Sequence, residues 1–419
     1  MDWDGISRRM FLKLSAAGLF GGHFLPGFLS RAVAETSGGS KRTLIVIFQR
    51  GAADGLSLVP PLEDPDYFAV RPTIAIPASG ELSALRLDGF FGLHPALSAL
   101  EPWWGQGSLA IVHQVGSPDQ SRSHFDAQDY MESGTPGNKV SDDGFLNRAM
   151  TASRYQISSP LRAVALQPTL PRILWGRFPA ISMVSIKDFA GGGLRNPGIE
   201  QGFEAMYRGA VDRVLRGEGD EAFKALRTLN DTQKAQAREQ ASNDGSMGGY
   251  PNSALGKRMH ELAQLIKGDV GLQIGVTDCG GWDTHVNQGS GKGQLSARLK
   301  ELGDALSAFA HDLGPRLENV VVVTMTEFGR TVKENGNRGT DHGHGSVMMV
   351  LGGQVRGKKV FSEWKGLKEA ALFQGRDLPV VYDYRDVMGE LLSKHMGVAA
   401  LDRVFPQYGG HPGKWLGLV

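Results

Sequence analysis

Residues 319–330 read NVVVVTMTEFGR, a β-branched apolar run that ends in a Thr-Glu-Phe-Gly-Arg motif. Runs of the same kind occur at residues 43–48 (TLIVIF), 109–115 (LAIVHQV), 271–277 (GLQIGVT) and 346–351 (SVMMVL). Between them, residues 254–267 and 295–313 carry apolar residues at helical spacing. Short buried strands that alternate with amphipathic helices are typical of an α/β fold. We therefore expect a mostly parallel central sheet flanked by helices.

The middle of the chain has a different pattern. From about residue 145 to 253 the sequence reads mainly as helices, with one strand-like piece at 162–166. This stretch ends in a polar run rich in glycine and serine at 240–253. We interpret residues 145–253 as a helical insertion into a sheet domain that spans 35–419.

The first 34 residues predict an export signal. Residues 7–13 read SRRMFLK, an apolar stretch follows at 14–30, and Ala32-Val33-Ala34 supplies a small-x-small cleavage site. Adjacent arginines in this context resemble a twin-arginine signal, so we expect the twin-arginine export machinery as a partner and a periplasmic or secreted location. A retained anchor is the alternative, but the stretch is short and contains His23 and Pro26, so we expect no stable membrane anchor.

The composition excludes several classes of protein. The 419 residues are 41% hydrophobic, which is typical of globular chains rather than disordered ones. Lys and Arg number 45 against 44 Asp and Glu, so no excess of positive charge argues for nucleic acid as a partner. Cys279 is the single cysteine, which excludes an intramolecular disulfide and a thiolate zinc site.

Polar motifs follow the apolar runs at 43–48, 271–277 and 319–325, and a further motif at 340–345 precedes the run at 346–351. In α/β proteins, ligands bind where such loops converge at the strand ends. The motifs supply carboxylates and imidazoles, the donors that suit zinc, manganese or a similar divalent metal. In extended backbone, residues i and i+2 point the same way, so Asp283 with His285, and His342 with His344, can each aim two ligands at one point. Taken singly, an Asp after a strand is more often a helix cap or turn residue, and one His of an H-x-H pair is more often structural. The candidate metal ligands are Asp54, Asp283, His285, Glu327, His342 and His344.

A further segment, at a predicted helix start, supplies a candidate nucleophile. Ser123 lies beside the backbone N–H groups of the first turn, which suits attack on a phosphate or sulfate, and His124 is a candidate metal or substrate ligand. The alternative is structural, because Ser123 and Asp126 together resemble a capping box. Arginines flank the motifs, and we expect Arg330 to be the one that contacts a tetrahedral anion.

The succession R-G-x-x-D-G, S-H-F, G-W-D-T-H, T-E-F-G-R and D-H-G-H-G resembles the exported bacterial family catalogued as domain of unknown function 1501. In order it is also similar to the alkaline phosphatase and sulfatase superfamily. The resemblance implies an alkaline-phosphatase-like fold with a metal cluster at the strand ends. Glu327-Phe328 stands where that superfamily has Asp-His, so one imidazole of its two-zinc pattern is absent. Cys279 lacks the Cys-x-Pro-x-Arg context, which excludes a formylglycine route and leaves a serine-based one.

These observations predict an exported, metal-dependent hydrolase that acts on phosphate or sulfate esters of small molecules or polysaccharides. The alternative is a non-catalytic protein that binds metal or carbohydrate on the same fold, favoured by the Glu327-Phe328 departure. A third interpretation is redox metal chemistry, suggested by the export route and the histidine-rich ending.

Overall fold

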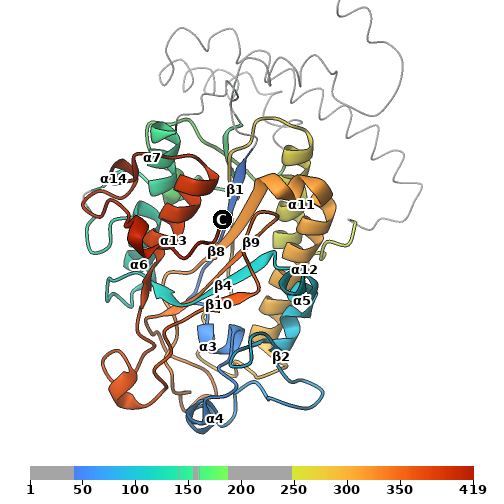
Figure 1. Ribbon diagram of the computed structural model, residues 1–419, viewed down its shortest axis with the longest axis vertical. Coiled ribbons are helices and arrows are strands. Elements are labelled where there is room, and N and C mark those ends of the chain that lie inside the picture. Colours follow the sequence, from blue (N-terminus) through green and yellow to red (C-terminus); the bar gives the residue numbers. More distant parts are fainter. Residues whose placement is uncertain (1–41, 140, 154–158, 160, 187–247) are drawn as a thin grey trace, which may run out of the picture.

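The computed structural model describes residues 42–139, 141–153, 159, 161–186 and 248–419 (Figure 1). The expected signal at 1–34 lies outside the described residues, as does the part of the expected insertion at 187–247. None of the described helices combines the length and the apolar character that a membrane span requires.

Nine strands of the described residues form the central sheet. Along the sheet they lie in the order β10 (Lys359–Phe361), β4 (Leu109–Gly116), β9 (Ser346–Gly352), β8 (Val320–Met325), β1 (Thr43–Gln49), β7 (Ile274–Cys279), β5 (Ala163–Leu166) and β6 (Ile181–Met183), and β11 (Tyr382–Asp383) pairs with β4. Every pairing is parallel except the two made by β9, which runs antiparallel to β4 and β8. The expected mixed α/β fold with a mostly parallel sheet is confirmed.

The reversed direction of β9 decides which loops meet. Because β9 is antiparallel to its neighbours, its first residue Ser346 pairs with Val115 near the end of β4, and its last residue Gly352 pairs with Val321 near the start of β8. The segment that precedes β9 therefore lies at the same edge as the segments that follow β1, β4, β7 and β8. Motifs before one strand and after four others are brought to a single edge.

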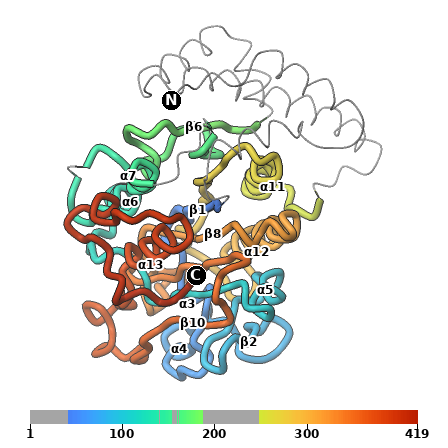
Figure 2. Tube along the Cα trace, turned by 45° about the horizontal axis from the view of Figure 1, so that its top comes forward, coloured from blue at the N-terminus to red at the C-terminus, as the bar shows by residue number. Residues whose placement is uncertain are grey.

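Helices cover both faces of the sheet, and the alternation along β1 shows why. Ile45 and Ile47 belong to a core shared with α11 (Ala254–Lys267), α12 (Gln294–Leu313) and α5 (Glu101–Gly105). Leu44, Val46 and Phe48 point to a second core shared with α7 (Phe145–Ala152), α13 (Tyr384–Glu390) and α14 (Leu401–Val404). In Figure 2, α7 and α13 lie on one side of β1 and β8, and α11 and α12 lie on the other.

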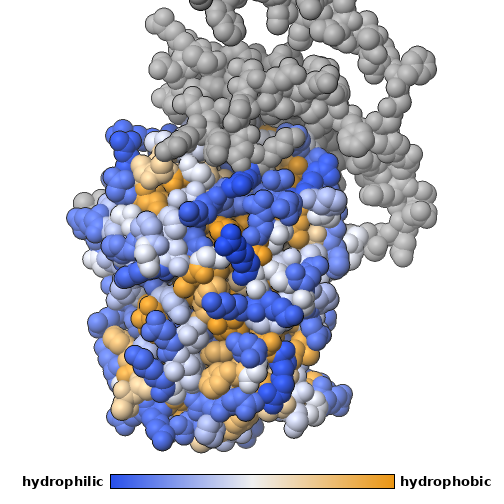
Figure 3. All heavy atoms as spheres, viewed as in Figure 1, coloured by the Kyte–Doolittle hydropathy of each residue, from blue (hydrophilic) through white to orange (hydrophobic). Residues whose placement is uncertain are grey.

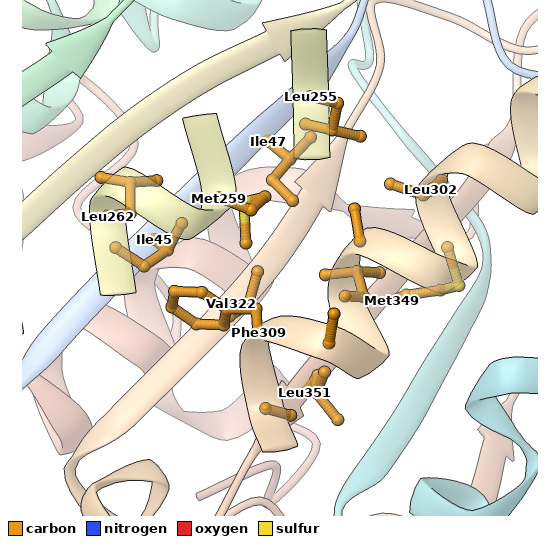
Figure 4. Packing of buried hydrophobic residues seen from close by; sticks show 14 of the residues in the cluster. Ile45, Ile47, Leu255, Met259, Leu262, Leu302, Phe309, Val322, Met349 and Leu351 are labelled. Atoms are coloured by element: carbon orange, nitrogen blue, oxygen red, sulfur yellow. The ribbon is translucent and has the colours of Figure 1, made fainter. Parts of the chain in front are cut away.

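The first core shows how the sequence pattern becomes packing. Figure 4 shows side chains of α11 and α12 directed toward the apolar residues of β1, β8 and β9. The residues labelled there are Ile45, Ile47, Leu255, Met259, Leu262, Leu302, Phe309, Val322, Met349 and Leu351. Outside, Figure 3 shows a face on which hydrophilic residues are interspersed with smaller apolar patches. Burial of these apolar side chains, about 1.5–3 kcal/mol each, stabilises the scaffold beneath the strand-end loops.

Part of the expected insertion belongs to the sheet. The described residues of 145–253 include α7, and the strand-like piece at 162–166 forms β5, which pairs with β7. The strand β6 then pairs with β5 at the edge of the sheet. The remaining described α-helices, and the strands outside the sheet, are α3 (Gly55–Leu58), α4 (Pro65–Val70), α6 (His124–Ser133), β2 (Leu85–Arg86) and β3 (Gly92–Leu93). Short 3-10 or π-helical turns complete the described elements.

Candidate metal centre

Three imidazoles and one carboxylate meet at the carboxyl edge of the sheet. His124 is the first residue of α6, which follows β4, while Asp283 and His285 lie in the segment after β7. His342 lies in the segment before β9. Ligand atoms of His124, Asp283 and His342 all lie within 4.8 Å of one another. We call the four residues the His-Asp cluster.

The Nε2 atoms of the three imidazoles face the same point. Nε2 of His342 lies 3.1 Å from Nε2 of His124 and 3.0 Å from Nε2 of His285. The Asp283 carboxylate lies among them, with Oδ1 at 2.9 Å from His285 Nε2 and 3.3 Å from His342 Nε2, and Oδ2 at 3.5 Å from His124 Nε2. Ligands about 2.0–2.1 Å from a tetrahedral zinc ion would lie ~3.3 Å apart. The spacing of His124, Asp283 and His342 therefore fits a divalent cation. His285 is close to Asp283 and His342 but does not belong to the group in which all ligand atoms lie within 4.8 Å of one another.

The other nitrogen of each ring is held by an acceptor outside the cluster. Nδ1 of His124 donates to Glu327 Oε1 at 2.7 Å, Nδ1 of His285 donates to Asp341 Oδ1 at 3.1 Å, and Nδ1 of His342 donates to the Arg122 carbonyl at 2.9 Å. A neutral imidazole with its proton on Nδ1 presents a lone pair on Nε2. The lone pair of His342 would then lie about 3 Å from those of His124 and His285, an arrangement that a bound cation stabilises.

Asp283 is fixed by a buried guanidinium. Nη1 of Arg330 donates to Asp283 Oδ1 at 2.6 Å, and its Nε donates to the Thr340 hydroxyl at 3.1 Å. The Arg330 side chain is fully buried, whereas that of Asp283 is 43% exposed. Burial acts to raise the pKa of Asp283, but the hydrogen bond and charge of Arg330 and the nearby imidazoles lower it overall. Asp283 is thus held as a carboxylate, and Arg330 contacts it rather than solvent.

Glu327 orients His124. Its buried carboxylate accepts hydrogen bonds from His124 Nδ1, from the Gln128 amide at 2.9 Å and from the Gly51 N–H at 2.8 Å. Burial acts to raise the pKa of Glu327, and these hydrogen bonds together lower it. The hydrogen bond to Glu327 in turn raises the pKa of His124. Glu327 thus contacts the His124 ring on its Nδ1 atom, outside the cluster. A carboxylate in this position sets the orientation and the basicity of the ring.

Burial is the main cause that lowers the pKa of His342. The neutral ring, which can bind a cation, is therefore the favoured form of His342.

Asp54 occupies a separate place. Its carboxylate is 1% exposed and forms a two-point ion pair with Arg71, at 2.6 and 3.0 Å, while Ser57 and the Gln288 amide also donate to it. Burial acts to raise the pKa of Asp54, but the charge and hydrogen bonds of Arg71 outweigh it and lower the pKa. The structure does not bring this carboxylate to the His-Asp cluster. Its contacts correspond to a buried ion pair.

The structure separates His344 from His342. His344 is 7% exposed and stacks on Phe373, with ring centroids 4.3 Å apart. Burial lowers its pKa. The prediction that His342 and His344 point the same way assumed extended backbone between them. In the structure only His342 reaches the His-Asp cluster.

Ser123 caps α6. Its hydroxyl accepts a long hydrogen bond of 3.5 Å from the Asp126 N–H, as the capping interpretation expects. The same hydroxyl also forms a hydrogen bond with the side chain of Asp126. In the described part of the chain, no hydrogen bond joins it to the His-Asp cluster. Ser123 nevertheless directly precedes His124.

Glycines let the loops of the centre approach one another. Gly51 has φ +118°, and a Cβ atom on it would lie 2.7 Å from the backbone nitrogen of Asp283. A Cβ atom on Gly343 would lie 2.4 Å from the carbonyl group of Arg330. Any larger residue at either position would displace the backbone that carries a cluster residue or its partner.

Sequence reasoning missed the outer partners. Asp341 is part of the D-H-G-H-G motif, but nothing in the sequence distinguishes it as a partner of His285, with which it forms a hydrogen bond. Arg71 and Gln288 complete the Asp54 network, and no motif marks them. Residues of this kind are recognised only from contacts across large sequence separations.

No curated protein matches the chain. A family model described as Protein of unknown function (DUF1501) matches residues 104–405, a range that includes the whole His-Asp cluster and leaves out Asp54. Because this match covers more than half of the chain, the resemblance expected from the motifs is confirmed at the level of the family. The chain belongs to the DUF1501 family.

Proposed function

We propose that this protein is a metal-dependent hydrolase of phosphate or sulfate esters. The single observation that carries the proposal is the convergence of three imidazole Nε2 atoms on the Asp283 carboxylate, with every Nδ1 held by an outer acceptor. Imidazole and carboxylate donors suit zinc, manganese or a similar divalent ion. When bound, such an ion would supply Lewis acidity toward an ester oxygen.

The residues around the cluster support a site that works on a substrate from solvent. The side chains of His124 and His342 are 24% and 25% exposed, and those of His285 and Asp283 are 39% and 43% exposed. Structural zinc sites are closed, whereas catalytic sites keep one position open to solvent and substrate. Partial exposure of all four members therefore favours chemistry over a purely structural ion.

Ser123 is the candidate nucleophile. It stands at the N-terminus of α6, where backbone N–H groups and the helix dipole favour an anionic group. Its hydroxyl must give up its two hydrogen bonds with Asp126, one to the backbone N–H and one to the side chain, before it can turn toward a substrate. Formation of a bond from Ser123 Oγ to phosphorus or sulfur would release the alcohol of the ester, and water would later free the serine.

A second candidate function is non-catalytic binding of a metal or carbohydrate. The observation that favours it is the placement of Arg330, whose fully buried guanidinium is committed to Asp283 and Thr340 rather than to a substrate. In this case the cluster holds an ion, but no ester is turned over.

We also propose the alkaline-phosphatase-like fold and the export that the sequence predicts. A mostly parallel sheet with the His-Asp cluster at its strand ends is what the resemblance to that superfamily implies, and it supports an alkaline-phosphatase-like fold. The twin-arginine pattern at residues 7–13 supports export to the periplasm or beyond.

The test is a turnover assay with aryl phosphates and aryl sulfates, using purified protein loaded with zinc or manganese. We expect hydrolysis of one ester class by the wild type, at least about 100-fold slower hydrolysis by Asp283→Asn, and no change in Asp304→Asn. Asp304 is the matched control because it pairs with Lys300 on α12. Metal binding without turnover of either ester would refute the hydrolase and favour the second candidate.

A further inference from the structure

Two arginines beside the His-Asp cluster share one buried carboxylate. Nη2 of Arg122 lies 2.7 Å from Asp377 Oδ2, while Nε and Nη2 of Arg376 lie 2.9 and 3.0 Å from Asp377 Oδ1 and Oδ2. The Asp377 side chain is fully buried, but those of Arg122 and Arg376 are 30% and 45% exposed. The carboxylate anchors both guanidinium groups from beneath and leaves part of each facing solvent.

The charge of this group is not balanced. Two guanidinium groups against one carboxylate leave a net charge of +1. The side chain next to them is neutral, since Gln374 accepts a hydrogen bond from Arg122 Nη2 at 2.8 Å. In the described part of the chain, the Nη1 groups of Arg122 and Arg376 make no hydrogen bond. Each guanidinium therefore has N–H donors available to a further acceptor.

Both arginines are tied to the same cluster residue. The Arg122 carbonyl accepts a hydrogen bond from His342 Nδ1 at 2.9 Å, and Nη2 of Arg376 donates to the His342 carbonyl at 2.7 Å. His342 is thus connected to both arginines through backbone carbonyl groups, its own and that of Arg122. An anion held by the two guanidinium groups would lie near His342.

We propose that Arg122 and Arg376 form an oxyanion-binding subsite that holds the phosphate or sulfate group of a substrate next to the His-Asp cluster. Planar guanidinium groups donate paired N–H bonds to tetrahedral oxyanions, and Asp377 fixes their orientation before the anion binds. The substrate role rests on the proposed function, but binding of the oxyanion itself does not. The subsite supplies the anion contacts that the buried Arg330 does not make.

The test is calorimetric titration of inorganic phosphate and of sulfate into chelator-treated protein at pH 8 and low ionic strength, where charge interactions are little screened. We expect measurable binding by the wild type and at least about tenfold weaker binding by Arg376→Gln and by Arg122→Gln. Arg376→Lys keeps the charge without the planar fork and should bind with intermediate affinity. Arg86→Gln is the matched control, since Arg86 pairs with Glu63 on the surface, and it should bind as the wild type does.

The outcomes separate this subsite from the proposed function. Absence of phosphate and sulfate binding in the wild type, or binding by both glutamine variants that equals binding by the wild type, overturns the subsite. Zinc binding, measured separately on the same proteins, reports on the His-Asp cluster. Phosphate binding without zinc binding would support the oxyanion subsite and refute the metal centre. Zinc binding without phosphate or sulfate binding would refute only the subsite. Unfolding curves of the variants show whether a loss of binding reflects a loss of folding.

Discussion

Glu327 Oε1 lies 2.7 Å from Nδ1 of His124, across 203 residues of sequence. Through this contact the buried carboxylate fixes the ring so that Nε2 faces Asp283 and His342. Glu327 therefore determines how the His124 ring is oriented within the His-Asp cluster.

Replacement of this carboxylate tests the assignment. Glu327→Gln retains the size of the side chain but can turn an amide N–H toward His124 Nδ1, which would favour the tautomer with the proton on Nε2. We expect zinc affinity, measured by competition with a chromogenic chelator, to fall about 10–100-fold. Asp304→Asn serves again as the control. Unchanged affinity in Glu327→Gln would show that the contact does not tune the ligand.

Asp54 should contribute to stability rather than to metal binding. Asp54→Asn leaves the buried charge of Arg71 without a partner, which costs about 3–5 kcal/mol in the free energy of unfolding. We expect a large loss of stability in urea unfolding and zinc affinity close to that of the wild type for the folded protein. A loss of bound metal with little loss of stability would instead place Asp54 among the ligands.

The same ion pair gives a pH dependence. The pKa of Asp54 is lowered in the folded protein, so the unfolded chain binds its proton more readily. Its contribution to stability is therefore complete above the unfolded pKa of about 4 and is lost as the pH falls through the lower folded pKa. Between neutral pH and about pH 3, the wild type should lose more free energy of unfolding than Asp54→Asn does. Parallel pH profiles of the two proteins would contradict this.

The sequence was sufficient for the sheet and for part of the site. β-branched runs located the central strands, and the segments that follow the strands located Asp283 and His285, because local patterns determine both. The antiparallel direction of β9 was not visible, since pairing direction depends on contacts far apart in the chain. For the same reason the spacing of His342 and His344 could not show that only one of them reaches the cluster.

The sequence also does not show which side chain a given carboxylate contacts. Asp54 and Glu327 both follow strands and look alike in sequence, yet Asp54 meets Arg71 and Glu327 meets His124. The difference arises from which distant side chain packs against each of them. Sequence patterns indicate the edge of the sheet at which a residue lies but not the group that it contacts there.

Ser123→Ala separates the capping role from the nucleophilic role. Loss of the cap should cost about 0.5–2 kcal/mol in the free energy of unfolding and leave zinc affinity unchanged. If Ser123 is the nucleophile, ester turnover should fall by at least about 100-fold in the folded, metal-loaded protein. Turnover equal to that of the wild type would remove Ser123 from the mechanism and leave it as a helix cap.

Gly51→Ala tests the close approach of the loops. The added Cβ atom would lie 2.7 Å from the Asp283 nitrogen, at φ +118°. Gly80→Ala is the matched control because Gly80 has φ +101° with nothing within 4 Å. The control should lose about 1–2 kcal/mol from backbone strain alone, and Gly51→Ala should lose more stability and also bind zinc more weakly. Equal losses of stability and equal zinc affinities in the two variants would mean that the contact between Gly51 and the Asp283 backbone does not determine the geometry of the His-Asp cluster.

The most direct test of the central claim is elemental analysis of the purified protein after dialysis against zinc or manganese. The account predicts about one divalent ion per chain in the wild type and almost none in a His342→Ala, Asp283→Asn double variant that remains folded. A metal-free wild type, or equal metal content in the two proteins, would contradict it.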